Sequence, residues 1–580
     1  MNKIMSGNEA YARGAYEAGV GFVSSYPGTP STEITEFISK YDNICSEWAI
    51  NEKVAAEAAL GASLSGRRAM TCMKHVGLNL ASEPLMTGSY TGVNAGFVII
   101  VADDPSMHSS QNEQDSRNYA RFAKVPMLEP SDSQEAKDYI KLAFEISEKF
   151  SVPVIVRSET RISHSMSVVS IGEPAETFKK DFEKDTDKWV MVPANARVRH
   201  RAVEERLKCL QAYSGLLAKV DKGQGGYGVI CSGVTYQYVK EALPDARIFK
   251  LAMVWPLPIK EIEEFSATVD KLYVVEELDP IFETEIKAAG IDIEPLPRNI
   301  CGELSQDAVS KLFNGGEEIN ESDVVRELPV RPPNLCPGCS HRGLFYAISR
   351  LKLFSFGDIG CYTLGLLPPL NAVNTAVCMG ASVSMAHGAD RATNGEAATK
   401  SVAVIGDSTF LHTGLPALIS SVYNKGASTI VILDNRITGM TGHQPNPASG
   451  FTIKGEPVEP VKFPELCAAA GVKRIRVVDP FDIDECITVL KEETEAPEVS
   501  VIITNKPCIF ADRSVIKPSL IIDHNKCTGC KICTRLGCPA ITWDNYERKA
   551  SIDTSMCTGC DLCIRVCRFS AIGGQENING

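Results

Sequence analysis

The 580-residue sequence has no long apolar run, no stripe of basic residues and no apolar leader at its start. No apolar stretch reaches the roughly 18 residues of a membrane-spanning helix, so we expect no membrane segment. The first residues lack the apolar core of a secretory signal, which favours a cytoplasmic protein. A formal net charge of −13, with no basic stripe to offset it, disfavours nucleic-acid binding.

Cysteine, in contrast, is abundant, with 20 residues. Twenty cysteines could suggest a secreted disulfide scaffold, but such scaffolds are short and carry a signal. Because this chain is long and its cysteines cluster in C-x-x-C runs, we expect a metalloprotein of a reducing compartment. Eight other cysteines stand alone on apolar stretches and are predicted to be buried core residues: Cys45, Cys72, Cys209, Cys231, Cys301, Cys378, Cys467 and Cys486.

The most specific pattern is a pair of cysteine runs near the C-terminus. The first run is Cys527, Cys530, Cys533 and Cys538, and the second is Cys557, Cys560, Cys563 and Cys567. Thiolates two residues apart on a tight loop can converge on one iron–sulfur cubane, and the fourth cysteine of each run binds the other cluster. The predicted ligand sets are therefore Cys527, Cys530, Cys533 and Cys567 for cluster one, and Cys557, Cys560, Cys563 and Cys538 for cluster two. Disulfides and structural zinc are the alternatives, but zinc sites rarely contain C-x2-C-x2-C.

These runs resemble a bacterial two-cluster ferredoxin. Two departures are visible: the first run has four residues before its last cysteine instead of three, and Arg568 stands where a second proline would be. An extra residue lengthens a loop without moving the other ligands. The resemblance implies a ferredoxin-like α+β module with two [4Fe-4S] clusters over residues 515–580.

The remaining sequence reads as α/β domains, and the length suggests about four domains in all. In residues 1–170, apolar strand-like segments (AGVGFVSSYP, GRRAMTCMKH, AGFVIIVADD and SVPVIVRSE) alternate with helical patterns, which predicts a doubly wound parallel sheet. Residues 225–315 and 334–514 repeat this alternation. A charged linker followed by a helix is predicted at 171–224, and a second linker at 316–333.

Two polar segments follow predicted parallel strands in the third α/β domain. Gly406-Asp407-Ser408 ends the strand VAVIGD, and Asp434-Asn435 ends the strand TIVILD. The carboxyl ends of parallel strands are where α/β sheets bind ligands. An acid and an amide oxygen there suit Mg²⁺, which prefers octahedral oxygen coordination and can clamp a diphosphate. By itself a Gly-Asp pair at a strand end is often only a turn, so both interpretations stay open at this point.

Together these segments resemble the GDG…NN motif of the thiamine-diphosphate fold. Ser408 replaces the final glycine and Asp434 the first asparagine, but both presumed ligand positions are kept. The resemblance implies that Asp407, Asn435 and the backbone carbonyl of Ile437 bind Mg²⁺. The Thr-Gly-rich stretch that follows is similar to one found in related oxidoreductases.

The N-terminal segment resembles the corresponding part of 2-oxoacid:ferredoxin oxidoreductases. In NEKVAAEAALGAS, Glu52 opens an Ala/Gly-rich helix after a strand. The resemblance implies that its carboxylate contacts N1′ of the thiamine aminopyrimidine. Glu47 and Glu57 are the competing acids, which we expect to be solvated or structural. The loop YPGTPST resembles the substrate-side loop of the same family, where Thr29 would face the 2-oxo acid.

The segment CPGCSH, which opens the third α/β domain, resembles the CPGCGH-type motif of the family's catalytic subunits. The resemblance implies a third [4Fe-4S] cluster beside thiamine, held by Cys336, Cys339, Cys361 and Cys508. No local spacing shows that these four cysteines converge, and the alternative is a loop dithiol with two buried cysteines. The cluster is favoured because an electron step from thiamine to the tail needs a nearby acceptor.

Three histidines and one polar loop are further candidates. His75 and His341 lie in segments that should approach the cofactor, and His443 follows the predicted magnesium loop. Each could position substrate or relay a proton, or could be a satisfied structural histidine. In the loop DDPSMHSSQNEQDSR, His108 or Arg117 could meet the substrate carboxylate, or the loop could simply be solvated.

The thiamine motifs, the ferredoxin-like tail and their order together resemble the indolepyruvate ferredoxin oxidoreductase family. The resemblance implies a pyrimidine-type thiamine-binding domain at 1–170, a transketolase-C-like domain at 225–315 and a diphosphate-type thiamine-binding domain at 334–514. The implied reaction is oxidative decarboxylation of an aryl pyruvate with coenzyme A, which gives an aryl-acetyl-CoA, CO₂ and reduced ferredoxin.

A partner is also implied, because related enzymes have one more α/β domain that this chain does not contain. We expect it as a separate beta subunit of roughly 200 residues, in a heterotetramer. The alternatives are a 2-oxo acid of another class as substrate, or a non-catalytic electron-transfer subunit with a vestigial thiamine fold. The presence of Asp407, Asn435 and Glu52 argues against the second alternative.

Overall fold

The structure is a computed structural model that describes four stretches of the chain: residues 1–182, 184–297, 301–314 and 333–574. The chain forms two compact units, residues 1–328 and 329–580, and each is described by itself. The predicted linker at 316–333 lies outside the described residues, except for Pro333. Among the described helices, none combines the length and the apolar character needed to cross a membrane.

The first unit contains a seven-stranded sheet with the order β12-β6-β7-β5-β4-β2-β3. Its strands are β2 (Phe22–Ser25), β3 (Cys45–Trp48), β4 (Ala69–Lys74), β5 (Phe97–Asp103), β6 (Met127–Leu128), β7 (Val154–Glu159) and β12 (Met253–Trp255). All neighbours pair in parallel except β12, which runs antiparallel to β6. The four strands predicted in this segment are β2, β4, β5 and β7, so the doubly wound α/β prediction is confirmed.

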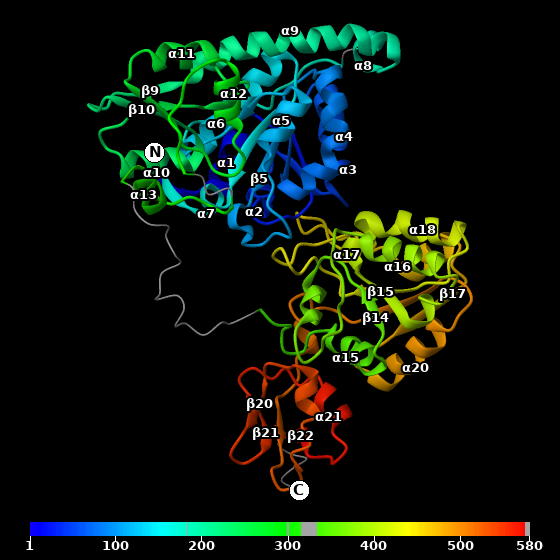
Figure 1. The fold of residues 1–580 in the computed structure, drawn as a ribbon. Helices are drawn as coiled ribbons and strands as arrows, with labels where there is room; N and C mark the ends of the chain where they lie inside the picture. The colour runs from blue at the N-terminus through cyan, green and yellow to red at the C-terminus, as the bar shows by residue number, and fades with distance from the viewer. Residues whose placement is uncertain (183, 298–300, 315–332, 575–580) are drawn as a thin grey trace. The chain divides into compact units, whose positions relative to one another are not determined.

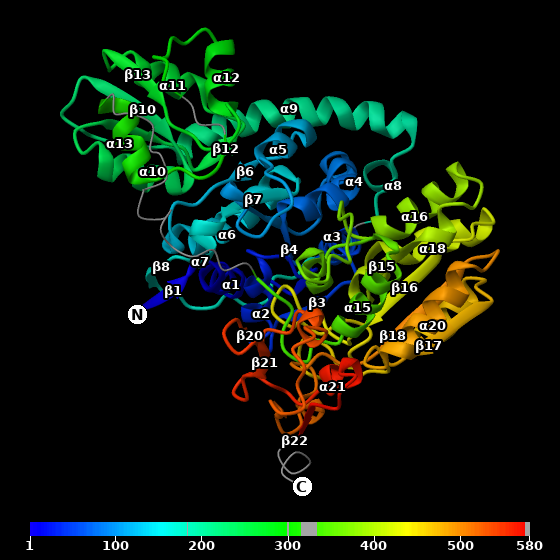
Figure 2. The ribbon, with the colours of Figure 1, turned by 60° about the horizontal axis from the view of Figure 1, so that its bottom comes forward.

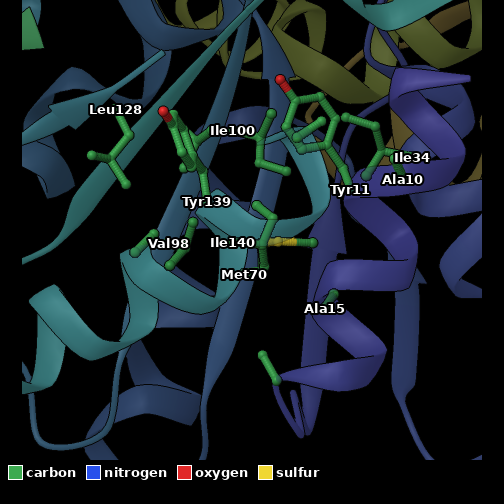
Figure 3. Packing of buried hydrophobic residues seen from close by; sticks show 14 of the residues in the cluster. Ala10, Tyr11, Ala15, Ile34, Met70, Val98, Ile100, Leu128, Tyr139 and Ile140 are labelled. Atoms are coloured by element: carbon green, nitrogen blue, oxygen red, sulfur yellow. The ribbon is translucent and has the colours of Figure 1, made fainter. Parts of the chain in front are cut away.

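Helices cover both faces of this sheet. They are α1 (Gly7–Glu17), α2 (Thr32–Ile38), α3 (Glu52–Leu64), α4 (His75–Thr91), α5 (Arg117–Ala123) and α6 (Ser133–Phe150). Along β5, Val98 and Ile100 belong to one apolar core, whereas Ile99 and Val101 belong to the core on the other face. Figure 3 shows the first core, in which Tyr11 of α1 lies among strand side chains. Alternate side chains point to opposite faces, so a strand buried on both faces reads as a continuous apolar run.

The segment after residue 170 does not form a separate compact unit. Its four-stranded sheet has the order β13-β10-β11-β9, but β12 joins the edge of the N-terminal sheet. The elements are α9 (Pro193–Leu217, the long helix in Figure 1), β9 (Lys219–Asp221), β10 (Tyr227–Cys231), α10 (Gly233–Ala242), β11 (Arg247–Lys250), α11 (Ile259–Ser266), β13 (Lys271–Val274), α12 (Ile281–Ala288) and α13 (Gln306–Asn314). The helix predicted within 171–224 and the alternation of strands and helices predicted for 225–315 are therefore present.

Short elements complete the first unit. They are β1 (Asn2–Ser6), which pairs antiparallel with β8 (Met166–Ser170), α7 (Thr160–His164) and α8 (Thr186–Trp189). The charged linker before α8 is mostly exposed, as predicted, but it is also attached to the domain surface. The amides of Ala175, Phe178 and Lys180 donate hydrogen bonds to backbone carbonyls of the N-terminal domain.

A buried network of charges connects the two sheets of the first unit. Arg117 of α5 forms ion pairs with Asp115 at 2.6 Å and with Glu276 at 2.8 Å, and it also donates to the carbonyl of Glu277. Arg157 of β7 pairs with Asp103 at 2.7 Å. Buried arginines are tolerated here because carboxylates surround them.

Glu159, beside Arg157, is a buried acid whose pKa is raised. Burial, followed by the charge of nearby Glu277, raises the pKa of Glu159 well above its ordinary value, although Arg157 acts in the opposite direction. The Oε2 atom of Glu159 is buried and accepts no hydrogen bond from the described residues. A proton shared by Glu159 and Glu277 is consistent with the raised pKa of Glu159.

The second unit contains a five-stranded parallel sheet with the order β14-β15-β16-β18-β17. The strands are β14 (Phe354–Phe356), β15 (Ser401–Gly406), β16 (Thr429–Asp434), β17 (Arg474–Val478) and β18 (Ser500–Asn505), of which four are labelled in Figure 2. Around them lie α15 (Arg342–Leu351), α16 (Ala381–Ala392), α17 (Asp407–Thr409), α18 (Leu415–Tyr423), α19 (Phe463–Ala469) and α20 (Ile483–Thr494). The predicted strands VAVIGD and TIVILD are β15 and β16.

The tail is an α+β module, as predicted. It pairs β19 (Leu520–Ile522) with β22 (Ile572–Gly574), and β20 (Ile541–Asp544) with β21 (Lys549–Ile552), and includes the short helix α21 (Leu562–Val566). The apolar core of the tail is continuous with that of the sheet domain. Leu536, Leu562 and Ile572 of the tail belong to the same apolar cluster as Phe345 of α15 and Val404 of β15. The tail therefore packs directly on the parallel-sheet domain of its unit.

The prediction for the isolated cysteines is only half right. Cys72, Cys231, Cys467 and Cys486 are buried, but Cys45, Cys209, Cys301 and Cys378 are exposed. An apolar neighbourhood in sequence does not say which face of an element a residue occupies. Cys45 begins the edge strand β3, and Cys209 lies on an outward face of α9.

Glu277→Gln should change how stability depends on pH. The folded wild-type chain binds a proton at Glu159 that the unfolded chain releases. Its free energy of unfolding therefore falls as pH rises from the ordinary glutamate pKa toward the raised pKa of Glu159. In the variant the introduced amide can donate to ionised Glu159, so this loss disappears. Denaturant unfolding at about pH 5 and about pH 8 measures the difference.

The matched control is Glu264→Gln, which changes an exposed glutamate of α11. We expect the stability of Glu277→Gln relative to wild type to increase between the two pH values, and that of Glu264→Gln to stay constant. A relative stability of Glu277→Gln that is the same at both pH values would contradict the shared proton.

Candidate functional site

The predicted magnesium ligands lie at the carboxyl edge of the second unit's sheet. Asp407 follows β15 and Asn435 follows the neighbouring strand β16, and both side chains are buried. The amide of Arg436 donates to Oδ2 of Asp407 at 2.7 Å, and the amide of Ser408 to Oδ1 at 2.6 Å. The amide of Ile437 donates to Oδ1 of Asn435 at 3.2 Å. Backbone amides therefore fix the orientation of both side chains.

The electrostatics of this edge suit a divalent cation. Burial, and then the charge of Asp434, raises the pKa of Asp407 to about 7. Burial also raises the pKa of Asp434, whose Oδ1 is buried and makes no hydrogen bond with the described residues. Two buried carboxyls close together are unfavourable as a pair of anions, and a bound cation relieves this. The donor set therefore fits Mg²⁺.

The side chains of His341 and Tyr362 lie beside Asn435 and contact each other. The amide nitrogen of Asn435 lies 3.3 Å from Nε2 of His341 and donates to the neutral ring, because burial lowers the pKa of His341 to about 4. The rings of His341 and Tyr362 meet edge to face at 6.0 Å. A Cβ atom at Gly406 would lie 2.6 Å from the Tyr362 ring, so this position needs glycine. Ser408 accepts a hydrogen bond from the hydroxyl of Thr438.

The structure brings together the four cysteines of the predicted third cluster. Cys336 and Cys339 lie in the loop before α15, Cys361 follows β14, and Cys508 follows β18. Their thiols interact electrostatically in a connected set: Cys361 with Cys336 and Cys508, and Cys339 with Cys336 and Cys361. Cys508 also interacts with Asp407, and its amide donates to the Asn435 carbonyl at 3.0 Å. The set therefore adjoins the magnesium-type edge.

These thiols are poor acids unless a metal binds them. Burial raises the pKa of Cys339 to about 12 and, with the neighbouring thiols, that of Cys361 to about 11. A buried thiol of this kind ionises when it coordinates a metal. The residues present therefore fit a thiolate-ligated cluster and do not suggest a reactive free cysteine.

The tail cysteines line two cavities, and each cavity takes its fourth cysteine from the other run. One is lined by Cys527, Cys530, Cys533 and Cys567, and the other by Cys538, Cys557, Cys560 and Cys563. Within the described part of the chain, no three His, Cys, Asp or Glu side chains are arranged to hold a single metal ion.

The CPGC loop also borders the second of these cavities. Pro337, Gly338 and Arg342 line it together with the four tail cysteines. Gly338 has a φ of +70°, and a Cβ atom there would lie 2.3 Å from Oγ1 of Thr558, between two tail cysteines. This close approach, and the backbone conformation, both require glycine.

In the first unit, Glu52 and Thr29 also lie at a carboxyl edge of the sheet. Glu52 is the first residue of α3, which is capped by the side chain of Asn51, and it is only 5% exposed. A Cβ atom at Gly77 of α4 would lie 2.6 Å from its Oε1, so the carboxylate rests against a glycine. Thr29, after β2, is half-buried and its carbonyl accepts from the hydroxyl of Ser109 at 3.4 Å.

His75 begins α4 at the end of β4. It is buried, burial lowers its pKa, and its Nε2 lies 3.2 Å from the carbonyl oxygen of Asn112. The preceding Lys74 is also buried, which lowers its pKa to about 8, and it donates to the carbonyl of Ser109 at 2.6 Å. Sequence reasoning missed Lys74, although a lysine at the end of an otherwise apolar strand was a visible signal.

Several alternative candidates have other partners. Arg117 is buried and paired with Asp115 and Glu276, so it is not available for a substrate carboxylate. His108 is exposed, with Glu303 3.5 Å away. The ring of His443 lies 4.6 Å from that of Phe510.

The competing acids are placed as expected. Glu47 accepts a hydrogen bond from Ser24 at 2.9 Å, and Glu57 is exposed on α3 beside Lys53 at 3.5 Å. Of the three acids considered, only Glu52 is buried. Asp358, which sequence reasoning missed, is another buried acid; it accepts from the amides of Gly380 and Ser382 and thereby anchors α16.

Family models match four successive segments of the chain. Their descriptions are pyruvate flavodoxin/ferredoxin oxidoreductase, thiamine diphosphate-binding (residues 13–208), indolepyruvate oxidoreductase domain (239–331), thiamine pyrophosphate enzyme, C-terminal TPP binding domain (358–504) and 4Fe-4S dicluster domain (519–568). The chain therefore has thiamine diphosphate-binding domains and a 4Fe-4S dicluster domain. The 4Fe-4S model covers all eight tail cysteines.

Curated relatives match along almost the whole chain. Indolepyruvate oxidoreductase subunit IorA of Pyrococcus horikoshii is 41% identical over 98% of this chain and 96% of its own length. The IorA subunit of Archaeoglobus fulgidus is 40% identical over 98% of this chain and 97% of its own length. The chain belongs to the IorA family. The resemblance to thiamine-dependent 2-oxoacid:ferredoxin oxidoreductases is thereby confirmed.

More distant relatives of the IorA family match only part of the chain. The 2-oxoglutarate synthase subunit KorA of Archaeoglobus fulgidus is 27% identical over 47% of this chain and 87% of its own length. A solved 2-oxoglutarate:ferredoxin oxidoreductase from Magnetococcus marinus has a TM-score of 0.46 and 20% identity, over 54% of this chain and 65% of that chain. Similarity at this level has no bearing on substrate.

Gly338→Ala should destabilise the second unit. The added Cβ would collide with Thr558 and would force an alanine into a left-handed conformation, so we expect a loss of more than about 1 kcal/mol. Thermal unfolding followed by circular dichroism measures it. The matched control is Gly388→Ala in α16, where a Cβ meets no atom and alanine favours the helix. Equal melting temperatures for the two variants would show that the CPGC loop is not held against the tail.

Proposed function

We propose that this chain is the catalytic subunit of an enzyme that oxidatively decarboxylates aryl pyruvates such as indolepyruvate. The co-substrate is coenzyme A, the products are an aryl-acetyl-CoA and CO₂, and the electrons pass to ferredoxin. The main support for the proposal is that the second unit contains a magnesium-type edge, an adjoining set of four thiols and two further thiol sets in the tail. The names of the IorA relatives support the aryl substrate.

The partner and the oligomer are part of the same proposal. A subunit name implies a second subunit, which we propose to be a beta chain of roughly 200 residues in a heterotetramer. Turnover of a panel of 2-oxo acids by the anaerobic complex tests the substrate class. Preference for indolepyruvate or another aryl pyruvate supports the proposal, and preference for 2-oxoglutarate, the compound named for the KorA relative, contradicts it.

Thiamine diphosphate, when bound, supplies the carbanion chemistry that releases CO₂. We propose that Asp407, Asn435 and the carbonyl of Ile437 hold Mg²⁺ for its diphosphate. Two features support this: backbone amides fix the orientation of Asp407 and Asn435, and His341 accepts from the side-chain nitrogen of Asn435. The Asn435 oxygen accepts from the amide of Ile437 and keeps its second lone pair for a cation. His341 thus contributes to cofactor binding by orienting Asn435, and Gly406 and Ser408 complete this edge.

Glu52 is proposed to exchange a proton with N1′ of the thiamine aminopyrimidine. A general base must be held in one orientation, and support comes from the cap of Asn51 and the close contact with Gly77. Thr29 is proposed to face the 2-oxo acid. His75, buried and with a lowered pKa, is proposed to contact the cofactor as a neutral ring.

The electron path is proposed to use three [4Fe-4S] clusters. The third set of thiols adjoins Asp407, so it would take electrons from the site of chemistry. The two tail sets would pass them to ferredoxin. A non-catalytic electron-transfer subunit is the rival proposal, and it predicts that changes at Glu52 and Asp407 have no effect on turnover.

Glu52→Gln and Asp407→Asn should impair different steps, turnover in the first variant and cofactor binding in the second. Loss of the Glu52 carboxylate removes proton exchange but no cofactor ligand, so turnover should fall on the order of 10²–10⁴-fold while thiamine diphosphate still binds. Asp407→Asn should first weaken cofactor binding and make it require more Mg²⁺. Release of labelled CO₂ and calorimetric titration of thiamine diphosphate at several Mg²⁺ concentrations measure the two effects.

Glu57→Gln is the control, because Glu57 lies on the same helix as Glu52 but is exposed. It should keep wild-type turnover and cofactor affinity. Near-full turnover in Glu52→Gln would refute the assignment and leave a different acid to be found.

The intact chain should contain about twelve iron atoms. Cys336→Ser or Cys508→Ser should remove about four of them, and Cys567→Ser should damage the cluster of Cys527, Cys530 and Cys533 despite its distance in sequence. Iron and sulfide assays after anaerobic purification give the counts. Cys467→Ser, at a buried cysteine outside the three sets, should keep all twelve. About eight iron atoms in the wild-type chain would exclude the third cluster.

A further inference from the structure

Arg342, the first residue of α15, is almost wholly buried, with 1% of its surface exposed. Its Nη1 donates to the carbonyl of Leu536 at 2.8 Å, and its Nη2 donates to the carbonyls of Leu335 at 2.6 Å and Cys336 at 3.1 Å. One guanidinium therefore joins two cysteine-bearing segments. Leu536 lies two residues before Cys538 of the tail, and Cys336 belongs to the third thiol set.

All acceptors of Arg342 are neutral carbonyls. Across the described ranges of the chain no carboxylate forms an ion pair with Arg342, and its buried Nε has no hydrogen-bond acceptor. The other two large buried arginines, Arg117 and Arg157, are each surrounded by carboxylates. A buried cation without an anion is strongly unfavourable, so the surroundings of Arg342 lack a negative charge.

Cysteine sulfurs of two different sets lie within electrostatic reach of this guanidinium. Cys339 belongs to the third set and Cys560 to the second tail set. Burial raises the pKa of both thiols, and the positive charge of Arg342 acts on both in the opposite direction. Arg342 also lines the cavity that the second tail set surrounds. Thiolate-bound clusters at these two sets would supply the missing negative charge on both sides.

We propose that Arg342 is the shared counter-cation of two iron–sulfur sites, the one at Cys336, Cys339, Cys361 and Cys508 and the one at Cys538, Cys557, Cys560 and Cys563. This inference rests on the cluster assignments proposed above. Arg342 is a positioning residue: it fixes the two ligand segments against each other, and its charge stabilises the reduced form of either cluster.

The redox step has a simple balance. One electron moves from one cluster to the other, so the donor is oxidised and the acceptor reduced, and no proton moves and no bond forms or breaks. Electrons originate in the 2-oxo acid and leave to ferredoxin. A reduced cluster carries one more negative charge than an oxidised one, so a fixed cation nearby raises its reduction potential. Because Arg342 lies beside both sites, it favours electron occupancy at either one.

Removing the charge of Arg342 should change the reduction potentials of these two clusters but not that of the cluster at the first tail set. Cys533 of the first tail set interacts electrostatically with Cys527, Cys530 and Cys567, but Arg342 is not among its main interactions. The cluster at that set should therefore keep its potential when the charge at position 342 is removed. A merely structural role for Arg342 would not predict a difference between the two tail clusters.

The test is a redox titration of the full complex, followed by electron paramagnetic resonance, for Arg342→Met, Arg342→Lys and the control Arg350→Met. Arg350 is on the same helix and donates a hydrogen bond to the hydroxyl of Tyr346. Signals are assigned by their loss in Cys508→Ser and Cys567→Ser. We expect Arg342→Met to shift the potentials of the third and second-tail clusters to more negative values, with the first-tail cluster unchanged. Arg342→Lys and Arg350→Met should remain near wild type.

Unchanged potentials in Arg342→Met, or an equal shift of all three clusters, would overturn the inference. Iron content separates the remaining outcomes. Loss of iron in Arg342→Met together with retained iron and potentials in Arg342→Lys supports a role for the charge, whereas loss in both variants shows a structural role only and overturns it. If wild type contains no third cluster, that assignment fails separately, and the shift of the second-tail cluster alone decides the inference.

Discussion

All strands of a parallel sheet end at the same edge, and this constraint determines where the chemistry of the second unit lies. Asp407 and Asn435 follow the adjacent strands β15 and β16, while Cys361 and Cys508 follow β14 and β18. Cys361 and Cys508, which are about 150 positions apart in sequence, therefore lie at one edge although no local motif links them. The magnesium-type edge and the third thiol set adjoin each other because Asp407 and Asn435 follow strands that neighbour those followed by Cys361 and Cys508.

A shared apolar core then sets the position of the tail. Leu536 and Leu562 of the tail belong to the cluster that includes Phe345 and Val404 of the sheet domain. A ferredoxin-like module on a flexible linker would have to find its electron donor by diffusion. Here packing, the close approach of Gly338 to Thr558 and the bonds of Arg342 keep the CPGC loop against the tail.

Much of this arrangement could be predicted from the sequence because it depends on local pattern. Continuous apolar runs predicted the correct positions of strands such as β5 and β16. The spacing of the tail cysteines predicted which fourth cysteine belongs to each tail set. Other features depend on packing between distant segments. The joining of β12 to the first sheet, the ion pairs of Arg117 and the exposure of Cys45 leave no local signal. The convergence of Cys361 and Cys508 could be inferred only from resemblance, since their spacing carries no information.

In the proposed electron path, electrons from the substrate enter the clusters of this chain directly. The most direct test mixes the anaerobic complex with indolepyruvate in the absence of ferredoxin and freezes it within a single turnover. Electron paramagnetic resonance then reports reduced clusters, and trapped CO₂ reports decarboxylation. The account predicts that reduced tail clusters appear with CO₂ in the wild-type complex, and that Cys508→Ser releases CO₂ while its tail clusters are reduced much more slowly. Release of CO₂ from the wild-type complex with all clusters still oxidised would contradict it.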